Sequence, residues 1–274
     1  MVNIDVNLAA AILTLGIIVM CARRGIEGDS RKKTFVFSAV ILFIISLLSI
    51  LLEFTDDIGS YALAVAADTT LEILINLLNM GWFMYILLEI CEKEEYLRRR
   101  LRLFMPPMFL LICVDIINIF TGLIWYYDAE LNYYENDPPY IIYDLFRYAY
   151  IFAALIQYLY YRKRNVRMYF FSAWFFVIPL FLGGFVEKLT GYTVFQLGAA
   201  LAMTMLYMLS ANEDSFMDEP TGFYNSYYLS YLYNMIDLGG YELGSILTYE
   251  IKEDDETEPF SKKLKALLPD KCDA

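Results

Sequence analysis

The chain has 274 residues, 59% of them hydrophobic, and a formal net charge of −12. A soluble domain is usually about 45–50% apolar, so this composition indicates an integral membrane protein that has the lipid bilayer as its main partner. The negative charge excludes nucleic acid as a partner. The sequence contains no histidine, which removes the commonest metal ligand and the usual general base near neutral pH.

Seven apolar segments follow one another, and each approaches or exceeds the roughly 20 residues that a helix needs to cross a bilayer. They occupy residues 5–22, 34–52, 64–90, 103–125, 140–161, 168–187 and 191–211. The expected fold class is an all-α membrane protein, with a seven-helix bundle over 1–211 and a small α+β segment over 212–274. The first segment is predicted to be a retained helix rather than a signal peptide, because Asp5 precedes its core and Arg23 follows it.

The connections between these segments alternate in charge. Lysines and arginines gather in the first, third and fifth connections, whereas the second and fourth are acidic and the sixth carries only Lys188. Loops rich in lysine and arginine stay in the cytoplasm. The sequence therefore predicts a multi-pass protein of the cell membrane with its N-terminus outside and its C-terminus in the cytoplasm.

Ionisable residues inside the segments are costly at membrane depth and usually have partners. Asp144 and Arg147 are three residues apart and share a helix face, and Asp115 is predicted to come within reach of Arg147. Asp68 and Glu72 lie at the start of the third segment, and Asn76 and Asn79 follow on nearby faces. Two interpretations stay open. Glu72, Asp115, Asp144 and Arg147 line an outward-facing pocket for a small extracellular ligand, or they form ion pairs that only fix the bundle.

The fourth connection, 125-WYYDAELNYYENDPPYIIY-143, is rich in aromatic residues at its two ends. Amphipathic rings prefer the membrane interface, so an aromatic belt is the first interpretation, and a lid over a small-molecule pocket is the alternative. The four cysteines contain no C-x-x-C pair. We expect thiols rather than a zinc site or a disulfide framework.

The polar segment begins with 218-DEPTGFYN-225. Four residues agree with the D-x-L-T-G-L-x-N-R signature that opens GGDEF domains, the diguanylate cyclase fold: Asp218, Thr221, Gly222 and Asn225. Pro220 and Ser226 stand where that family has leucine and arginine. With its helix count, the chain resembles bacterial (Firmicutes-type) seven-helix membrane proteins that carry a cytoplasmic GGDEF domain. A small polar extension unrelated to that family is the alternative for this segment.

The segment also departs from the family. Glu250 occupies the place of the aspartate that binds magnesium in the family, which makes it a candidate vestigial metal ligand. The acidic run 253–259 follows closely, and the G-G-D-E-F motif is missing from the sequence. Phosphoryl transfer of this type needs metal carboxylates and a loop that approaches the nucleotide. The resemblance therefore implies a truncated or degenerate domain with no catalytic residue and no cofactor.

Three functions are compatible with this sequence. The first is a membrane sensor whose tail acts by protein–protein interaction, as a homodimer or with another GGDEF protein. The second is an active diguanylate cyclase, which uses GTP and Mg²⁺ and requires that the sequence be incomplete. The third is a small-molecule transporter, in which the charged residues of the membrane segments contact the substrate.

Overall fold

The computed structural model describes residues 2–24, 30–54, 60–90, 94–128, 131–161 and 173–214, together with residues 216, 225 and 228. The chain divides into two compact units, Met1–Tyr207 and Met208–Ala274. Most of the segment that resembles a GGDEF domain lies outside the described residues, including Asp218, Thr221, Gly222 and Glu250.

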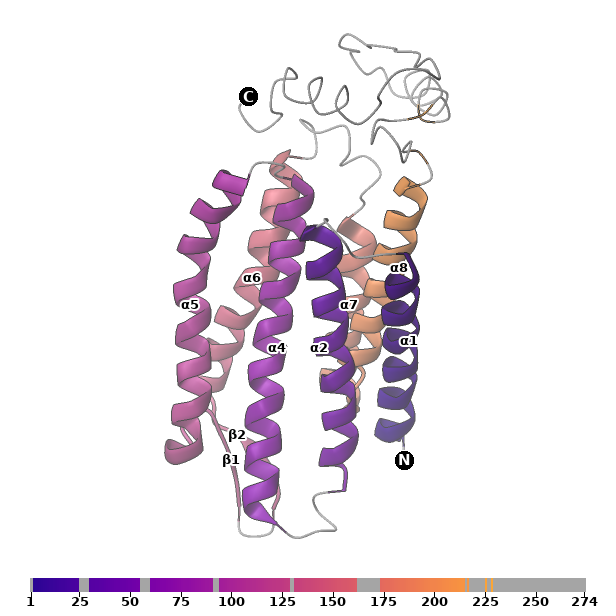
Figure 1. The fold of residues 1–274 in the computed structure, drawn as a ribbon. Helices are drawn as coiled ribbons and strands as arrows, with labels where there is room; N and C mark the ends of the chain where they lie inside the picture. The colour runs from indigo at the N-terminus through magenta and orange to yellow at the C-terminus, as the bar shows by residue number, and fades with distance from the viewer. Residues whose placement is uncertain are drawn as a thin grey trace. The chain divides into compact units, whose positions relative to one another are not determined.

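Long helices make up nearly all of the described chain (Figure 1). They are α1 (Val2–Arg24), α2 (Ser30–Leu52), α4 (Tyr61–Ile90), α5 (Glu94–Thr121), α6 (Pro139–Tyr161), α7 (Ala173–Thr190) and α8 (Phe195–Asp214). Five of the described helices contain a stretch long and apolar enough to cross a membrane: Val2–Arg23, Ser30–Leu52, Tyr61–Ile90, Arg102–Thr121 and Pro139–Tyr160. Phe195–Ala211 is a shorter apolar helix. The chain is therefore a multi-pass helical membrane protein.

Helix α4 is the centre of this bundle. Its most apolar stretch is 72% buried, whereas the corresponding stretches of α1, α2, α5 and α6 are between 22% and 44% buried. It packs against α2, α5 and α6. Gly81 of α4 allows the approach of α2, since a Cβ atom there would lie 2.5 Å from Ser38 Oγ. Small residues at such contacts are typical of helix packing in membranes.

Large apolar side chains on the outer helices point away from the protein. Phe120 of α5, Leu145 of α6 and Leu189 of α7 are examples, and each is mostly exposed. In water such a surface would be a liability, but lipid tails are as apolar as these side chains. The exposed apolar surface is therefore consistent with a bilayer environment for the bundle.

A second set of contacts joins α1 to the connection between α7 and α8. Asn3 donates to Glu53 Oε1 at 2.6 Å and accepts from the backbone N–H of Thr193 at 3.1 Å. Asn7, fully buried, donates to Thr193 Oγ1 at 3.0 Å. These bonds attach the start of α1 to the end of α2 and to the connection that precedes α8.

The fourth connection contains a β-hairpin, which the all-α expectation did not include. Strand β1 (Trp125–Tyr127) pairs antiparallel with β2 (Tyr133–Glu135), and Trp125 lies opposite Glu135. Helix α5 ends at Thr121 because Gly122 has a φ of +56° and its N–H bonds to Asn118 O at 2.9 Å. This is a common way to end a helix. The prediction that the fourth segment stays helical to residue 125 is therefore wrong at its end.

A similar glycine separates the last two helices. Gly191 has a φ of +70°, and its N–H bonds to Glu187 O at 2.8 Å, so α7 ends at Thr190. Lys188, expected in the sixth connection, lies instead in the last turn of α7. Helix α8 begins at Phe195, four residues later than predicted.

Candidate functional site

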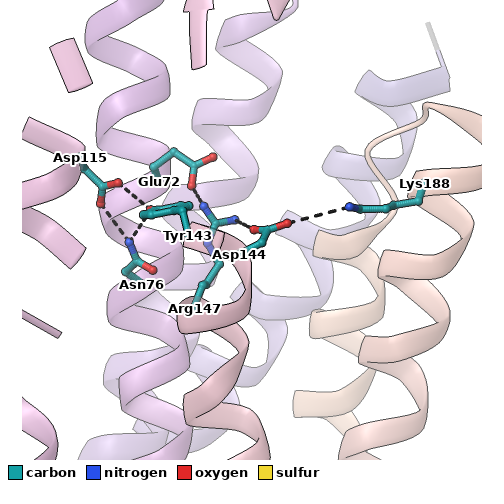
Figure 2. Close-up of polar contacts among 7 residues, drawn as sticks. All are labelled: Glu72, Asn76, Asp115, Tyr143, Asp144, Arg147 and Lys188. Carbon is teal, nitrogen blue, oxygen red and sulfur yellow. Dashed lines mark hydrogen bonds and ion pairs between the residues drawn. The ribbon is translucent and has the colours of Figure 1, made fainter. Parts of the chain in front are cut away.

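A chain of alternating charges runs across three helices (Figure 2). Arg147 of α6 pairs through Nη2 with Glu72 Oε2 of α4, and its Nη1 lies 3.4 Å from Asp144 Oδ1. The other oxygen of Asp144 lies 4.0 Å from Nζ of Lys188 on α7. The arginine side chain is only 8% exposed, whereas that of Lys188 is 72% exposed. This row of charged side chains, the charge chain, thus leads from the interior of the bundle to its surface.

A closed triangle of hydrogen bonds lies beside this charge chain. Tyr143 of α6 donates its hydroxyl to Asp115 Oδ1 of α5 at 2.6 Å. The Nδ2 group of Asn76 on α4 donates to Asp115 Oδ2 at 2.9 Å and to the Tyr143 hydroxyl oxygen at 2.8 Å. An amide NH₂ has two hydrogens, and a phenol both donates and accepts, so the three contacts are chemically compatible. The triangle joins α4, α5 and α6.

Tyr143 connects the triangle to the charge chain. Its ring lies 4.8 Å from the guanidinium carbon of Arg147, which is within the range of a cation–π interaction. We define the polar cluster as the seven residues drawn in Figure 2: Glu72, Asn76, Asp115, Tyr143, Asp144, Arg147 and Lys188. It draws on four helices of the bundle.

Part of the polar cluster lies toward one end of the helices. With a rise of 1.5 Å per residue, Asp144 and Arg147 are about 8 and 12 Å from the start of α6, and Asp115 is about 9 Å from the end of α5. The β-hairpin follows α5 directly and lies at that same end (Figure 1). Asn76, in contrast, is about 22 Å from the start of the 30-residue helix α4, so the cluster extends from near the hairpin end to the middle of the bundle.

The hairpin is attached to two of the three helices that the triangle joins, α4 and α5. Tyr127 of β1 donates its hydroxyl to Asp68 of α4 at 2.5 Å. Asn118 of α5 accepts from the N–H of Ile124 at 2.7 Å and donates to Trp125 O at 2.9 Å. Asp68 precedes Glu72 by one helical turn. The aromatic connection is therefore a β-hairpin that hydrogen bonds hold next to the polar cluster.

Several buried polar atoms have no hydrogen-bond partner among the described residues. They include both amide atoms of Asn79, Oδ1 of Asn76 and Nε of Arg147. Asn76 and Asn79 are each 1% exposed. Most buried polar groups in folded proteins are satisfied, so such atoms call for an explanation. The described residues contain no group of three or more histidine, cysteine, aspartate or glutamate side chains able to hold a metal ion.

The structure brings Glu72, Asp144 and Arg147 into direct contact. Asp115, however, bonds to Asn76 and Tyr143 and not to Arg147, so the expected contact between Asp115 and Arg147 is absent from the described interactions. The sequence predicted Tyr143 in the aromatic belt at the membrane interface and Lys188 in a loop, whereas both side chains belong to the polar cluster. The spacing of four residues between Tyr143 and Arg147 is the signal that places them on one helix face.

Asn225 is the one residue of the GGDEF-like signature that the structure describes. Its side-chain Oδ1 accepts from the N–H of Tyr228 at 3.3 Å, and Tyr228 is helical. Its own N–H bonds to Phe216 O at 2.8 Å. An asparagine that bonds the N–H three residues later is a typical helix N-cap. Asn225 therefore has a local structural role, because its side chain holds the N–H of Tyr228.

No protein-family model matches the chain, and comparisons with curated proteins and with solved structures give no significant match. Function is therefore inferred from the polar cluster and from the residues of the polar segment.

Proposed function

We propose that this chain is a membrane-bound signalling protein. In this proposal seven transmembrane helices perceive a small extracellular ligand, and a degenerate GGDEF-like tail passes the signal on by protein–protein interaction. The tail has no cyclase activity. It pairs with a second copy of the chain or with another GGDEF protein.

The polar cluster is the observation that carries this proposal. Its ion pairs and hydrogen bonds join α4, α5, α6 and α7. Buried networks of this kind have few alternative arrangements, and a helix that shifts must exchange one set of partners for another. Switching proteins use such discrete arrangements to convert a local contact into a movement of helices. A ligand that binds one arrangement better than another shifts the population toward it.

The charge of the connections supports an orientation in which the polar cluster faces outward. Basic residues stand in the first, third and fifth connections, which the positive-inside rule assigns to the cytoplasm. The β-hairpin and the N-terminus of α1 lie at the opposite end of the bundle (Figure 1). In this orientation the hairpin end of the bundle, with the part of the polar cluster near it, faces outward, and the polar segment that begins at residue 212 follows on the cytoplasmic side.

The sequence of the polar segment supports the relay role. Asp218, Thr221, Gly222 and Asn225 agree with the start of a GGDEF domain, while the catalytic motif is missing from the sequence. Glu250 would supply a single carboxylate. Magnesium sites use one or two carboxylates together with substrate phosphates, so Glu250 alone would hold the ion only weakly. Mg²⁺ and GTP therefore belong only to the competing cyclase hypothesis.

Cross-linking of the full-length chain in native membranes tests the proposal. Cys272 belongs to the polar segment, and a bismaleimide is expected to link two tails through it. Cys272→Ser is the control that must remove the linked dimer. If the tail instead pairs with another GGDEF protein, Cys272 is expected to link to that protein. No Cys272-dependent species of either kind would contradict the relay role.

The same assay tests communication between the bundle and the tail. Arg147→Met disturbs the buried part of the polar cluster, whereas Lys188→Met changes only its exposed end. We expect the yield of the Cys272-linked species to change in Arg147→Met and to stay at the wild-type level in Lys188→Met. Equal yields in all three proteins, each inserted and folded, would show that the polar cluster does not communicate with the tail.

A further inference from the structure

We infer that the polar cluster binds a small organic amine that carries one positive charge, next to Asp115, Asn76 and Asn79. The inference rests on the proposed sensor function and specifies the chemical class of its ligand. The first observation is the distribution of charge. The cluster contains three carboxylates and two cationic side chains, so one carboxylate lacks a counter-charge.

That carboxylate is Asp115. Glu72 and Asp144 both form ion pairs with Arg147, and Asp144 also faces Lys188. The partners of Asp115 are the neutral hydroxyl of Tyr143 and the neutral amide of Asn76. No cationic side chain among the described residues forms an ion pair with Asp115, which is fully buried. An ionised carboxylate in this position is stabilised most by a cation from outside the chain.

The second observation is a set of unused acceptors at the same place. Each oxygen of Asp115 accepts one hydrogen bond in the described contacts, whereas a carboxylate offers about four acceptor positions in total. Oδ1 of Asn76 has no partner among the described residues, although Asn76 holds Asp115 through its Nδ2 group. These free positions are all acceptors. An ammonium group supplies three N–H donors and the missing charge together.

Asn79 extends this surface by one helical turn. It lies three residues after Asn76 on α4, and neither its amide nitrogen nor its amide oxygen has a partner among the described residues. Residues three apart share a helix face. Its free donor and acceptor suit a neutral polar group, such as a hydroxyl, at the other end of the amine.

Other ligand classes fit less well. An anion would face the three carboxylates of the cluster, while its strongest donor, Arg147, is already held by Glu72 and Asp144. The described part of the chain offers no group of metal ligands. Because Asp115 is fully buried, the ligand enters only when the bundle or the hairpin opens, and association slower than typical encounter rates is expected.

The test uses the full-length protein in lipid nanodiscs. Methylamine, ethanolamine and 2-phenylethylamine, each as the hydrochloride, are titrated while the melting temperature and the heat of binding are recorded. A native-state ligand raises the melting temperature in a saturable way. We expect such a rise for at least one amine, and none with ethylene glycol or with NaCl at equal ionic strength.

Variants connect the effect to the site. Asp115→Asn keeps the shape of the side chain but removes its charge, and should weaken binding of the amine at least about tenfold, because a buried charge loses its partner. Asp5→Asn, which changes an exposed aspartate of α1, should bind like wild type. Asn79→Leu is the second variant, and it should also weaken binding of an amine with a hydroxyl.

Three results would overturn the inference: no response to any of the three amines, an equal response to NaCl, or unchanged affinity in both Asp115→Asn and Asn79→Leu. If Asp115→Asn does not fold, Asn79→Leu with ethanolamine decides alone. Failure of amine binding while Arg147→Met still alters Cys272 cross-linking rejects the ligand class and leaves the sensor proposal standing. Amine binding with cross-linking that never changes rejects the relay instead.

Discussion

Arg147→Met is the substitution that tests the polar cluster most severely. Methionine retains much of the apolar stem but removes the guanidinium, so Glu72 and Asp144 lose the cation that lies between them. Their side chains are only 11% and 13% exposed, so water compensates little. Removing one partner of a buried ion pair typically costs about 3–5 kcal/mol. We expect a loss of that size in the free energy of unfolding.

Lys188→Met is the matched control. Lysine 188 is mostly exposed, and its Nζ lies 4.0 Å from Asp144 Oδ2. Exposed ion pairs contribute about 0–1 kcal/mol, so this substitution should change the free energy of unfolding by no more than that. The two cations therefore differ in their expected effects, although they flank the same aspartate.

Titration with a denaturing detergent, followed by circular dichroism in mixed micelles, measures both variants. A double-mutant cycle with Glu72→Gln isolates the pair: the cost of Arg147→Met should fall by about 0.5–3 kcal/mol when Glu72 is already neutral. An Arg147→Met protein as stable as wild type, or no more affected than Lys188→Met, would refute the assignment of a buried ion pair at this position.

Three further predictions concern a helix contact, the hairpin and a buried amide. Gly198→Ala should lower the melting temperature, because its Cβ atom would lie 2.5 Å from Pro179 O, whereas Gly16→Ala, with nothing within 4 Å, should be neutral or raise it. Asn118→Ala should cost about 1–3 kcal/mol and speed amide exchange in the hairpin, since two buried hydrogen bonds are lost. Asn79→Leu should raise the melting temperature of the ligand-free protein, because it removes two unpartnered buried atoms.

The membrane bundle was predictable because it depends on composition over long segments. Runs of about 20 apolar residues specify helices that cross a bilayer, and five of the described helices contain such a stretch. The ends of the helices were less predictable. The left-handed conformation of Gly122 ends α5 before residue 125, and Trp125 to Tyr127 then form a strand. Tyrosine is enriched both at the membrane interface and in β-strands. The tyrosines of this connection therefore did not distinguish an interface belt from a hairpin.

Within the site, the contacts on one helix were easier to predict than the contacts between helices. The spacing of Asp144 and Arg147 places them on one face of α6. Whether Arg147 meets Glu72 of α4 or Asp115 of α5 depends on how each helix is rotated about its axis. Periodicity does not determine that rotation when most residues of a helix are apolar. The structure selects Glu72, and it uses Tyr143 and Asn76 to hold Asp115.

Synthesis of cyclic di-GMP tests the central claim most directly. The full-length protein, purified and placed in nanodiscs, is incubated with GTP and Mg²⁺, and the product is measured by mass spectrometry. The proposed signalling role predicts no cyclic di-GMP and no binding of GTP, because this sequence contains no G-G-D-E-F motif and the proposal leaves only Glu250 as a candidate metal ligand. Product that disappears in Glu250→Gln would contradict the account and identify the chain as an active cyclase.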